Sequence, residues 1–300
     1  MKKKPLMIFF AVLAGVAILV PEAYMPSIVK ASILLALGAL FLYFQRSFLF
    51  FAQANRELMK PSPRTDKVWT SYKKACAAGL PAPRIVSVAN AFIQRGDAAY
   101  GRELLHRPEV EELEDKTLKN QIQLILSMAD TREGNMPQAI ERLQALYEEG
   151  VREKTLFINL TTYLLAEGFS DKADLLLAEA DEAGLTSPGL DDNKGWSAIL
   201  QDKWDEAAEI YDALLEGSGP GFPEAYLHAA QVRFHLNLVE DGIALLGLAL
   251  TKRFSYVTGA DKDVIQQMID RLADEQADTG VLLRNLDEQK ARVAAGKSPW

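Results

Sequence analysis

The sequence predicts an all-α protein in which an N-terminal transmembrane helical hairpin precedes a solenoid of about five helix–turn–helix repeats and a C-terminal capping helix. Two uncharged apolar runs near the N-terminus predict the hairpin. A short motif that recurs at a separation of 34 residues predicts the repeats. Of the 300 residues, 49% are apolar and 25% are charged, so the chain can bury a sizeable core.

Charge divides the chain into two parts. Residues 1–80 carry eleven Lys and Arg against three acidic residues, a net charge of +8. Because the whole chain carries −8, the other 220 residues carry −16. Such an acidic portion repels phosphate backbones, so we do not expect residues 81–300 to bind nucleic acid. The lone cysteine, Cys76, cannot form an internal disulfide and is expected to be a small buried residue rather than a reactive thiol.

Two apolar runs are expected to cross a bilayer, at residues 5–21 and 26–45. The first would span about 26 Å as a helix, slightly less than a hydrocarbon core of about 30 Å. The second is uncharged from Ala31 to Gln45 and extends back to Pro26 if Lys30 reaches the headgroups. Two such runs joined by a short loop favour a hairpin. A cleaved signal peptide followed by one anchor, or an interfacial amphipathic arrangement, are the alternatives.

Basic residues lie outside the two runs, on the same side. Three lysines at positions 2–4 precede the first run, and seven Lys and Arg from Arg46 to Lys74 follow the second. The connecting loop has only Lys30 and Glu22. The positive-inside rule therefore places both termini in the cytoplasm, and we expect a two-span protein of a bacterial inner membrane.

Composition after the second run predicts the domain boundaries. Aromatic residues within 41–51 are expected at the inner membrane interface, and the basic residues that follow could bind anionic lipid headgroups. The segment Lys60-Pro-Ser-Pro-Arg64 cannot continue a helix. We therefore expect a hairpin with its flank at 1–52, a linker at 53–66, the solenoid at 67–260 and capping helices at 261–300.

The rest of the chain repeats with a period of 34 residues. The segments 134–140, 168–174 and 202–208 are similar, and each has a small residue at the same place: Ala139, Ala173 and Ala207. One looser copy precedes them, with Gly101 at this place, and one follows them, with Gly242. Apolar residues recur at three and four residues on both sides of each segment, which is typical of two helices joined by a tight turn. A small residue is needed where the paired backbones approach closely.

On these residues the chain resembles the tetratricopeptide repeat family, whose 34-residue unit has a glycine-containing turn and small residues in both helices. The best-matching copy is 154–187, through Phe157, Leu160, Thr161, Gly168, Ala173, Leu177 and Ala180. The other copies are 82–107, 120–153, 188–221 and 223–254. The copy at 188–221 departs most, because Asp202 replaces the turn glycine and Lys194 replaces an apolar residue. Val264, Met268 and Leu272 form an apolar stripe that would cap the stack.

We find no sequence pattern for catalysis. His106, His228 and His235 lack the spacing of three or four residues that a helical metal site needs. The loop at 217–221 lacks the Lys-Ser/Thr ending of a phosphate-binding loop. The acidic run at 109–115 is expected to be a solvated loop or helix start. The sequence therefore predicts neither an enzyme nor a cofactor or metal site.

The resemblance implies a concave groove, built from the first helices of the repeats, that binds extended or helical peptides of a partner protein. Helical phase nominates the groove residues Asn90, Gln121, Met128, Arg132, Ile158, Asn159, Thr162, Leu165, Asn193, Trp196, Gln231, Phe234 and His235. Asn159 and Asn193, again 34 residues apart, are the better candidates because an amide can both donate to and accept from a peptide backbone. The alternative is that these are ordinary solvated helix positions.

These features favour a membrane-anchored adaptor or scaffold that acts through protein–protein interaction. Two alternatives stay open. One is an accessory subunit of a membrane enzyme, or of an envelope or haem-biosynthesis assembly, which rests on architecture alone. The other is a self-assembling membrane scaffold, since small residues in the hairpin would allow close approach of helices in lipid and hence a homo-oligomer.

Overall fold

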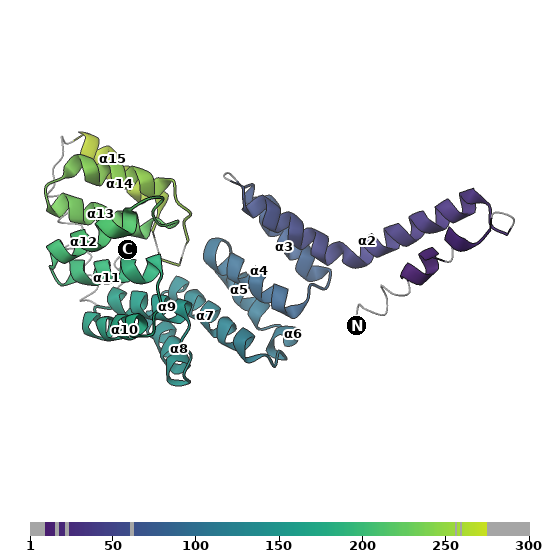
Figure 1. Cartoon of the computed structure of the whole chain (residues 1–300), viewed down its shortest axis with the longest axis horizontal. Coiled ribbons are helices and arrows are strands. Elements are labelled where there is room, and N and C mark those ends of the chain that lie inside the picture. Colours follow the sequence, from purple (N-terminus) through teal and green to yellow (C-terminus); the bar gives the residue numbers. More distant parts are fainter. Residues whose placement is uncertain are drawn as a thin grey trace. The chain divides into compact units, whose positions relative to one another are not determined.

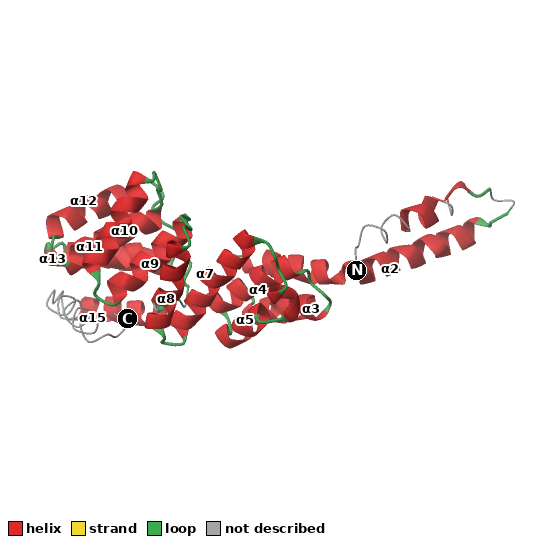
Figure 2. Cartoon of the chain, turned by 90° about the horizontal axis from the view of Figure 1, so that it is seen from below, coloured by secondary structure: helices red, strands yellow, loops and turns green. Residues whose placement is uncertain are grey.

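The computed structural model describes residues 10–15, 18–21, 24–60, 63–255, 257–258 and 260–274. Throughout these residues every regular element is a helix and no strand occurs (Figure 2). The prediction of an all-α protein is therefore confirmed. The chain divides into two compact units, Met1–Ile85 and Val86–Trp300.

Short connections join the helices (Figure 1). The first unit contains α2 (Ser27–Leu58) and α3 (Thr65–Ala77), and α4 (Ala82–Arg95) begins at its end. The helices that follow α4 in the second unit are α5 (Ala98–Leu105), α6 (Pro108–Glu111), α7 (Lys116–Arg132), α8 (Met136–Glu148), α9 (Lys154–Ala166), α10 (Ser170–Glu182), α11 (Pro188–Leu200), α12 (Trp204–Leu215), α13 (Glu224–His235), α14 (Val239–Leu250) and α15 (Lys262–Asp274).

Helix α2 is long and apolar enough to cross a membrane. Its 32 residues extend about 48 Å, and no residue of its most apolar 18-residue window is buried. Residues 10–15 and 18–19 of the first apolar run are also helical, and the ring of Phe10 lies 6.4 Å from that of Phe41 and 6.1 Å from that of Phe44. Most other residues of that run lie outside the described part of the chain.

Helix α2 continues past the position where the sequence predicted a linker. Residues 53–58, assigned to the linker, belong to α2, and Thr65 already begins α3. The reason is that residues 46–58 contain neither proline nor glycine, so nothing ends the helix before the prolines that follow Lys60. The prolonged part packs against α3, where the Tyr72 hydroxyl donates a hydrogen bond to Asn55.

The contact of α2 with α3 encloses both apolar and ionic groups. Cys76 of α3 is buried, as the sequence predicted. The carboxylate of Glu57, whose side chain is 5% exposed, lies 2.8 Å from Lys60 Nζ and 3.3 Å from Arg64 Nε. Lys60 and Arg64 belong to the segment between α2 and α3, so these ion pairs hold that segment against the end of α2.

The helices after α4 alternate as pairs joined by tight turns. Helices α8, α10 and α12 begin 34 residues apart, at Met136, Ser170 and Trp204. Each of these turns has one residue with positive φ, at Gly134, Gly168 and Asp202 (78°, 78° and 60°). The copy that lacks the turn glycine therefore keeps the turn, because aspartate is one of the few non-glycine residues that adopt this conformation.

Small residues lie where the two helices of each pair meet. Ala139, Ala173 and Ala207 are fully buried. A Cβ atom on Gly101 would come within 2.9 Å of the Ala89 carbonyl oxygen, and one on Gly242 within 2.5 Å of the Phe234 ring. The five positions that the sequence singled out are thus points of close helix–helix approach.

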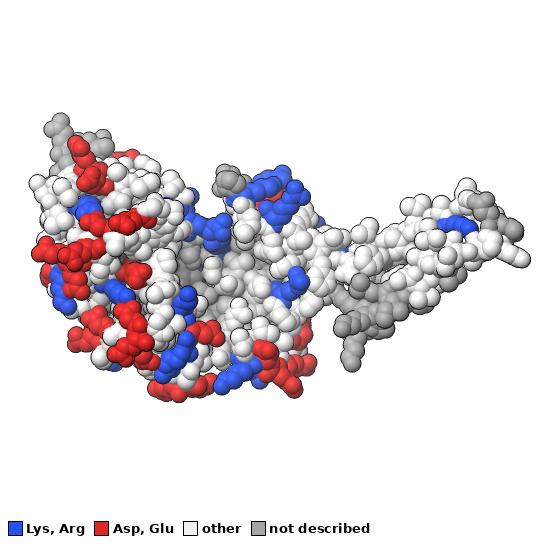
Figure 3. All heavy atoms as spheres, in the orientation of Figure 1, with Lys and Arg blue, Asp and Glu red and all other residues white. Residues whose placement is uncertain are grey.

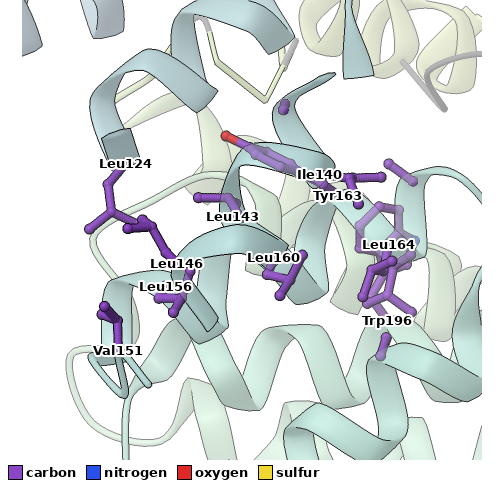
Figure 4. Packing of buried hydrophobic residues seen from close by; sticks show 14 residues of the cluster. Leu124, Ile140, Leu143, Leu146, Val151, Leu156, Leu160, Tyr163, Leu164 and Trp196 are labelled. Atoms are coloured by element: carbon purple, nitrogen blue, oxygen red, sulfur yellow. The ribbon is translucent and has the colours of Figure 1, made fainter. Parts of the chain in front are cut away.

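Apolar side chains fill the space between successive pairs. In Figure 4, Leu146 and Leu156 approach each other where α8 is followed by α9, and Leu164 lies beside Trp196 of α11. At the other end of the unit, α15 buries Ile265 and Leu272. Val264, expected in the capping stripe, is 53% exposed. The spacing 265, 268, 272 follows the helical period more closely than 264, 268, 272, which drifts around the helix.

A buried carboxylate also joins helices of the second unit. Asp130 of α7, whose side chain is 2% exposed, lies 2.7 Å from Arg102 Nη2 of α5 and 2.9 Å from Arg142 Nε of α8. Removing one partner of such a buried pair typically costs about 3–5 kcal/mol, because the other charge stays buried without compensation. Asp130 thus links the pair α7–α8 to α5.

Two glycines of α14 allow a matched test of the close approach. We expect Gly242→Ala to destabilise the protein by about 1–3 kcal/mol, because the new methyl group overlaps the buried Phe234 ring. Gly247→Ala, in the same helix and with nothing within 4 Å, should be neutral or stabilising by about 0.5–1 kcal/mol. Chemical denaturation of both variants measures the difference, and equal stabilities would show that the helices do not approach as described.

Candidate functional site

A large cleft lies in the second unit. Its volume is about 960 Å³, and its walls come from the α7–α8 turn, from α9, α11 and α13, and from the segment after α14. Apolar side chains such as Met136, Ile158 and Phe222 alternate there with polar ones. The cleft therefore crosses three successive helix pairs and is the leading candidate for a binding site in the described part of the chain.

One wall of the cleft contains a buried polar network. Asp192 of α11 accepts hydrogen bonds from Tyr211 of α12 (3.1 Å) and from the Nδ1 atom of His228 of α13 (2.9 Å). The His228 ring stacks on Trp196, with centroids 5.0 Å apart and planes inclined by 12°. Burial, together with the Asp192 carboxylate, raises the pKa of Tyr211 well above its usual value. The network joins three helices and gives the wall a defined shape.

Burial affects two glutamates of the cleft, Glu224 strongly and Glu167 partly. Burial raises the pKa of Glu224, and the hydroxyl of Thr258, which donates a hydrogen bond to its carboxylate, partly opposes this rise. Burial also raises the pKa of Glu167, at the end of α9. With Asp192, these residues make the titratable lining mainly acidic. Arg132 and Arg253 are the lining cations, and Arg132 donates to the carbonyl oxygens of Ile93 and Gly96, each at 2.8 Å.

The two asparagines singled out by the sequence differ in the cleft. Asn193 is buried, and its amide nitrogen donates to the Ile158 carbonyl (3.0 Å) and the Thr161 hydroxyl (2.6 Å), while its oxygen accepts from Thr162 (3.1 Å). A partner backbone would have to displace these bonds. Asn159 is different, because its Nδ2 atom has no hydrogen-bond partner among the described residues. This unpaired donor is itself buried, so a partner segment would reach it only if the side-chain amide of Asn159, which lines the cleft, turned toward that segment.

The cleft contains part of the predicted groove. The predicted residues that line it are Arg132, Ile158, Asn159, Thr162, Asn193 and Trp196. The predicted residues outside its lining are Asn90, Gln121, Met128, Leu165, Gln231, Phe234 and His235. Leu165 and Phe234 are buried in the core instead, and His235 stacks on Trp204 with centroids 3.8 Å apart.

Sequence reasoning missed the lining that comes from outside the first helices. Phe222 precedes α13, while Arg253, Val257 and Thr258 follow α14. Loop residues carry no helical phase, so no periodicity could have nominated them. Glu224 could have been predicted from the sequence, because it begins a repeat helix directly after Pro223. Helical phase instead nominated later positions of that helix.

The described residues bring together no group of three or more His, Cys, Asp or Glu side chains that could hold a metal ion. The loop at 217–221, which the sequence analysis compared with a phosphate-binding loop, connects α12 to α13. Asp115, the last residue of the acidic run at 109–115, accepts a hydrogen bond from the Leu118 backbone at the start of α7. What the cleft offers is therefore a set of hydrogen-bonding groups, aromatic rings and carboxylates, suited to holding a ligand.

No model of a known protein family matches the chain, and no curated protein sequence matches it. The likeness to tetratricopeptide repeats therefore stays a prediction. The function has to be argued from the cleft and from α2.

The desolvated Glu224 gives a pH-dependent prediction. Because its pKa is raised in the folded state, folding favours the protonated form, and stability is lost as the pH rises from the unfolded pKa through the folded one. We expect Glu224→Gln to raise the Tm at pH 7 by about 2–4 °C, with the advantage shrinking as the pH falls toward 4.5. Melting curves at several pH values measure this. The exposed Glu209→Gln is the control, and a pH-independent difference for Glu224→Gln would contradict the prediction.

Proposed function

We propose that this protein is a membrane-anchored adaptor of tetratricopeptide type, which binds a segment of a partner protein in the cleft of its second unit. The observation that carries the proposal is the cleft itself. Its wall crosses the first helices of three successive pairs, so an extended segment lying along it would meet each of them in turn. Its mixture of aromatic, apolar and amide groups suits a peptide better than a single polar metabolite.

The charge of the lining favours a partner segment with a basic residue. The lining has three carboxylates, of Glu167, Asp192 and Glu224, against two arginines. Of the arginines, Arg132 already donates to the carbonyl oxygens of Ile93 and Gly96, which leaves Arg253. In Figure 3, the charged side chains visible over α10–α13 are mostly Asp and Glu. A Lys or Arg side chain of the partner would meet the buried carboxylate of Glu224 and the partly buried one of Glu167, with which it can form ionic hydrogen bonds.

Membrane anchoring is the second part of the proposal. Large apolar side chains of α2 are exposed, among them Ile28 (76%) and Leu35 (75%), and water would disfavour such a surface. A bilayer would cover it. The contact of Phe10 with Phe41 and Phe44 supports a first crossing beside α2, and hence a hairpin. The basic residues that flank the apolar runs favour a cytoplasmic adaptor at a bacterial inner membrane.

The cleft is tested by co-purification from gently solubilised membranes. We expect the wild type to retain a stoichiometric partner, and Asn159→Ala to bind it about five- to tenfold more weakly, because one hydrogen bond of about 1–1.5 kcal/mol is lost. Truncation should leave the fold intact, since Asn159 Nδ2 has no partner among the described residues. Gln121→Ala, a predicted groove residue outside the cleft lining, is the control. Loss of the partner in Gln121→Ala alone would move the site away from the cleft.

Topology is tested by protease treatment of sealed vesicles. We expect the chain after Lys60 to be cut in inside-out vesicles and protected in right-side-out vesicles, because the basic flanks hold both ends of the hairpin in the cytoplasm. Disrupting the vesicles with detergent should allow cutting in both preparations. Cleavage confined to right-side-out vesicles would place the second unit outside and direct the search to envelope or secreted partners.

A further inference from the structure

A second hollow lies in the first unit, where α2 packs on α3. Its volume is about 290 Å³. Helix α2 contributes Phe50 and Gln53, and α3 contributes the other lining residues, Asp66, Lys67, Thr70, Ser71 and Lys74. Two ammonium groups, two hydroxyls and an amide thus surround one small space, a composition suited to the oxygen atoms of a phosphate group.

The cations of this hollow are weakly compensated. Lys74 is exposed, and no ion pair among the described residues includes it. Lys67 Nζ lies 3.9 Å from Glu57, whose carboxylate already receives Lys60 at 2.8 Å and Arg64 at 3.3 Å. Asp66 is the one acidic residue of the lining, and it is exposed. The hollow therefore keeps a positive charge that an anion would neutralise.

The position of the hollow along α2 indicates which anion would reach it. Arg46 lies about 28 Å along the helix from Ser27, close to the thickness of a hydrocarbon core. At this level one cation of α2 itself and two from later parts of the chain lie over aromatic rings of α2. Arg46 is 3.9 Å from the Tyr43 ring, Arg84 is 4.7 Å from that of Phe48, and Lys74 is 6.0 Å from that of Phe50. The fold thus gathers positive charge where lipid headgroups would begin.

We propose that the hollow between α2 and α3 binds the headgroup of an anionic phospholipid, with Lys67 and Lys74 on the phosphate. Thr70 and Gln53 donate hydrogen bonds to its remaining oxygens, and Asp66 accepts from hydroxyls of a glycerol headgroup. This inference rests on the membrane placement of α2 in the proposed function, but it is independent of the partner cleft. It assigns the basic part of the chain a lipid ligand in addition to its influence on topology.

The experiment titrates the detergent-solubilised full chain with short-chain phosphatidylglycerol and follows the heat of binding. Short-chain phosphatidylcholine is the zwitterionic reference, and glycerol phosphate tests the headgroup without a lipid tail. We expect saturable binding of phosphatidylglycerol that weakens with salt, and little binding of the other two. Equal binding of phosphatidylcholine would overturn the charge argument. Equal binding of glycerol phosphate, or no saturable binding of phosphatidylglycerol, would overturn the assignment to a lipid.

Paired variants locate the site. We expect Lys67→Gln/Lys74→Gln to bind phosphatidylglycerol on the order of 30-fold more weakly, since each lysine near an anionic surface contributes about fivefold. Lys116→Gln/Lys119→Gln removes the same charge from two exposed residues of α7 and should bind as the wild type does. Equal weakening in both double variants would reduce the effect to net charge and overturn the site.

Alkaline extraction of membranes separates failure of this inference from failure of the proposed function. The Lys67→Gln/Lys74→Gln variant should stay in the membrane fraction with the wild type, because the apolar surface of α2 is unchanged. Release of the wild type itself would contradict membrane anchoring. Retention of both, without selective binding of phosphatidylglycerol, would remove only the lipid site.

Discussion

The close approach of two helices within each pair is the constraint on which the second unit depends. At Ala139, Ala173 and Ala207 the side chain is fully buried, and at Gly101 and Gly242 even a methyl group would overlap the facing helix. Close packing fixes the rotation of the second helix relative to the first, so each pair presents the same sides to its neighbours. The repeat period in the sequence thus reflects one helix–helix contact that recurs in every pair.

Polar bonds between successive pairs then determine the shape of the cleft. Asn193 of α11 donates to the Ile158 carbonyl of α9, and Asp192 of the same helix binds His228 of α13. These groups are buried, so leaving them unsatisfied would be costly, and the bonds hold three first helices at defined positions. Of the two amides that the sequence assigned to a partner, that of Asn193 is therefore used to build the wall, whereas that of Asn159 keeps a buried donor without a hydrogen-bond partner among the described residues.

Local features of the sequence predicted most of the helices, because periodicity and turn residues act over a few positions. Even the turn at Asp202 forms without glycine. The cleft was predicted only in part, for two reasons. Helical phase identifies which residues share one side of a helix, but not whether that side faces the cleft or a neighbouring helix. Leu165 and Phe234 were therefore predicted to line the groove, although they lie in the core. The segment after α14, including Thr258, reaches the cleft through contacts between distant parts of the chain, which no short pattern records.

Helix α2 runs without interruption from its exposed apolar part to the part that packs on α3. A continuous helix without proline curves only gently over this length, since a sharp kink would require an interruption of its backbone hydrogen bonds. In a bilayer thinner than its apolar part, such a helix accommodates the mismatch by tilting. Because Tyr72 and the groups around Glu57 fasten α3 to the same helix, α3 must tilt with it. In the proposed membrane placement of α2, the thickness of the bilayer would thereby set the angle of α3 relative to the membrane surface.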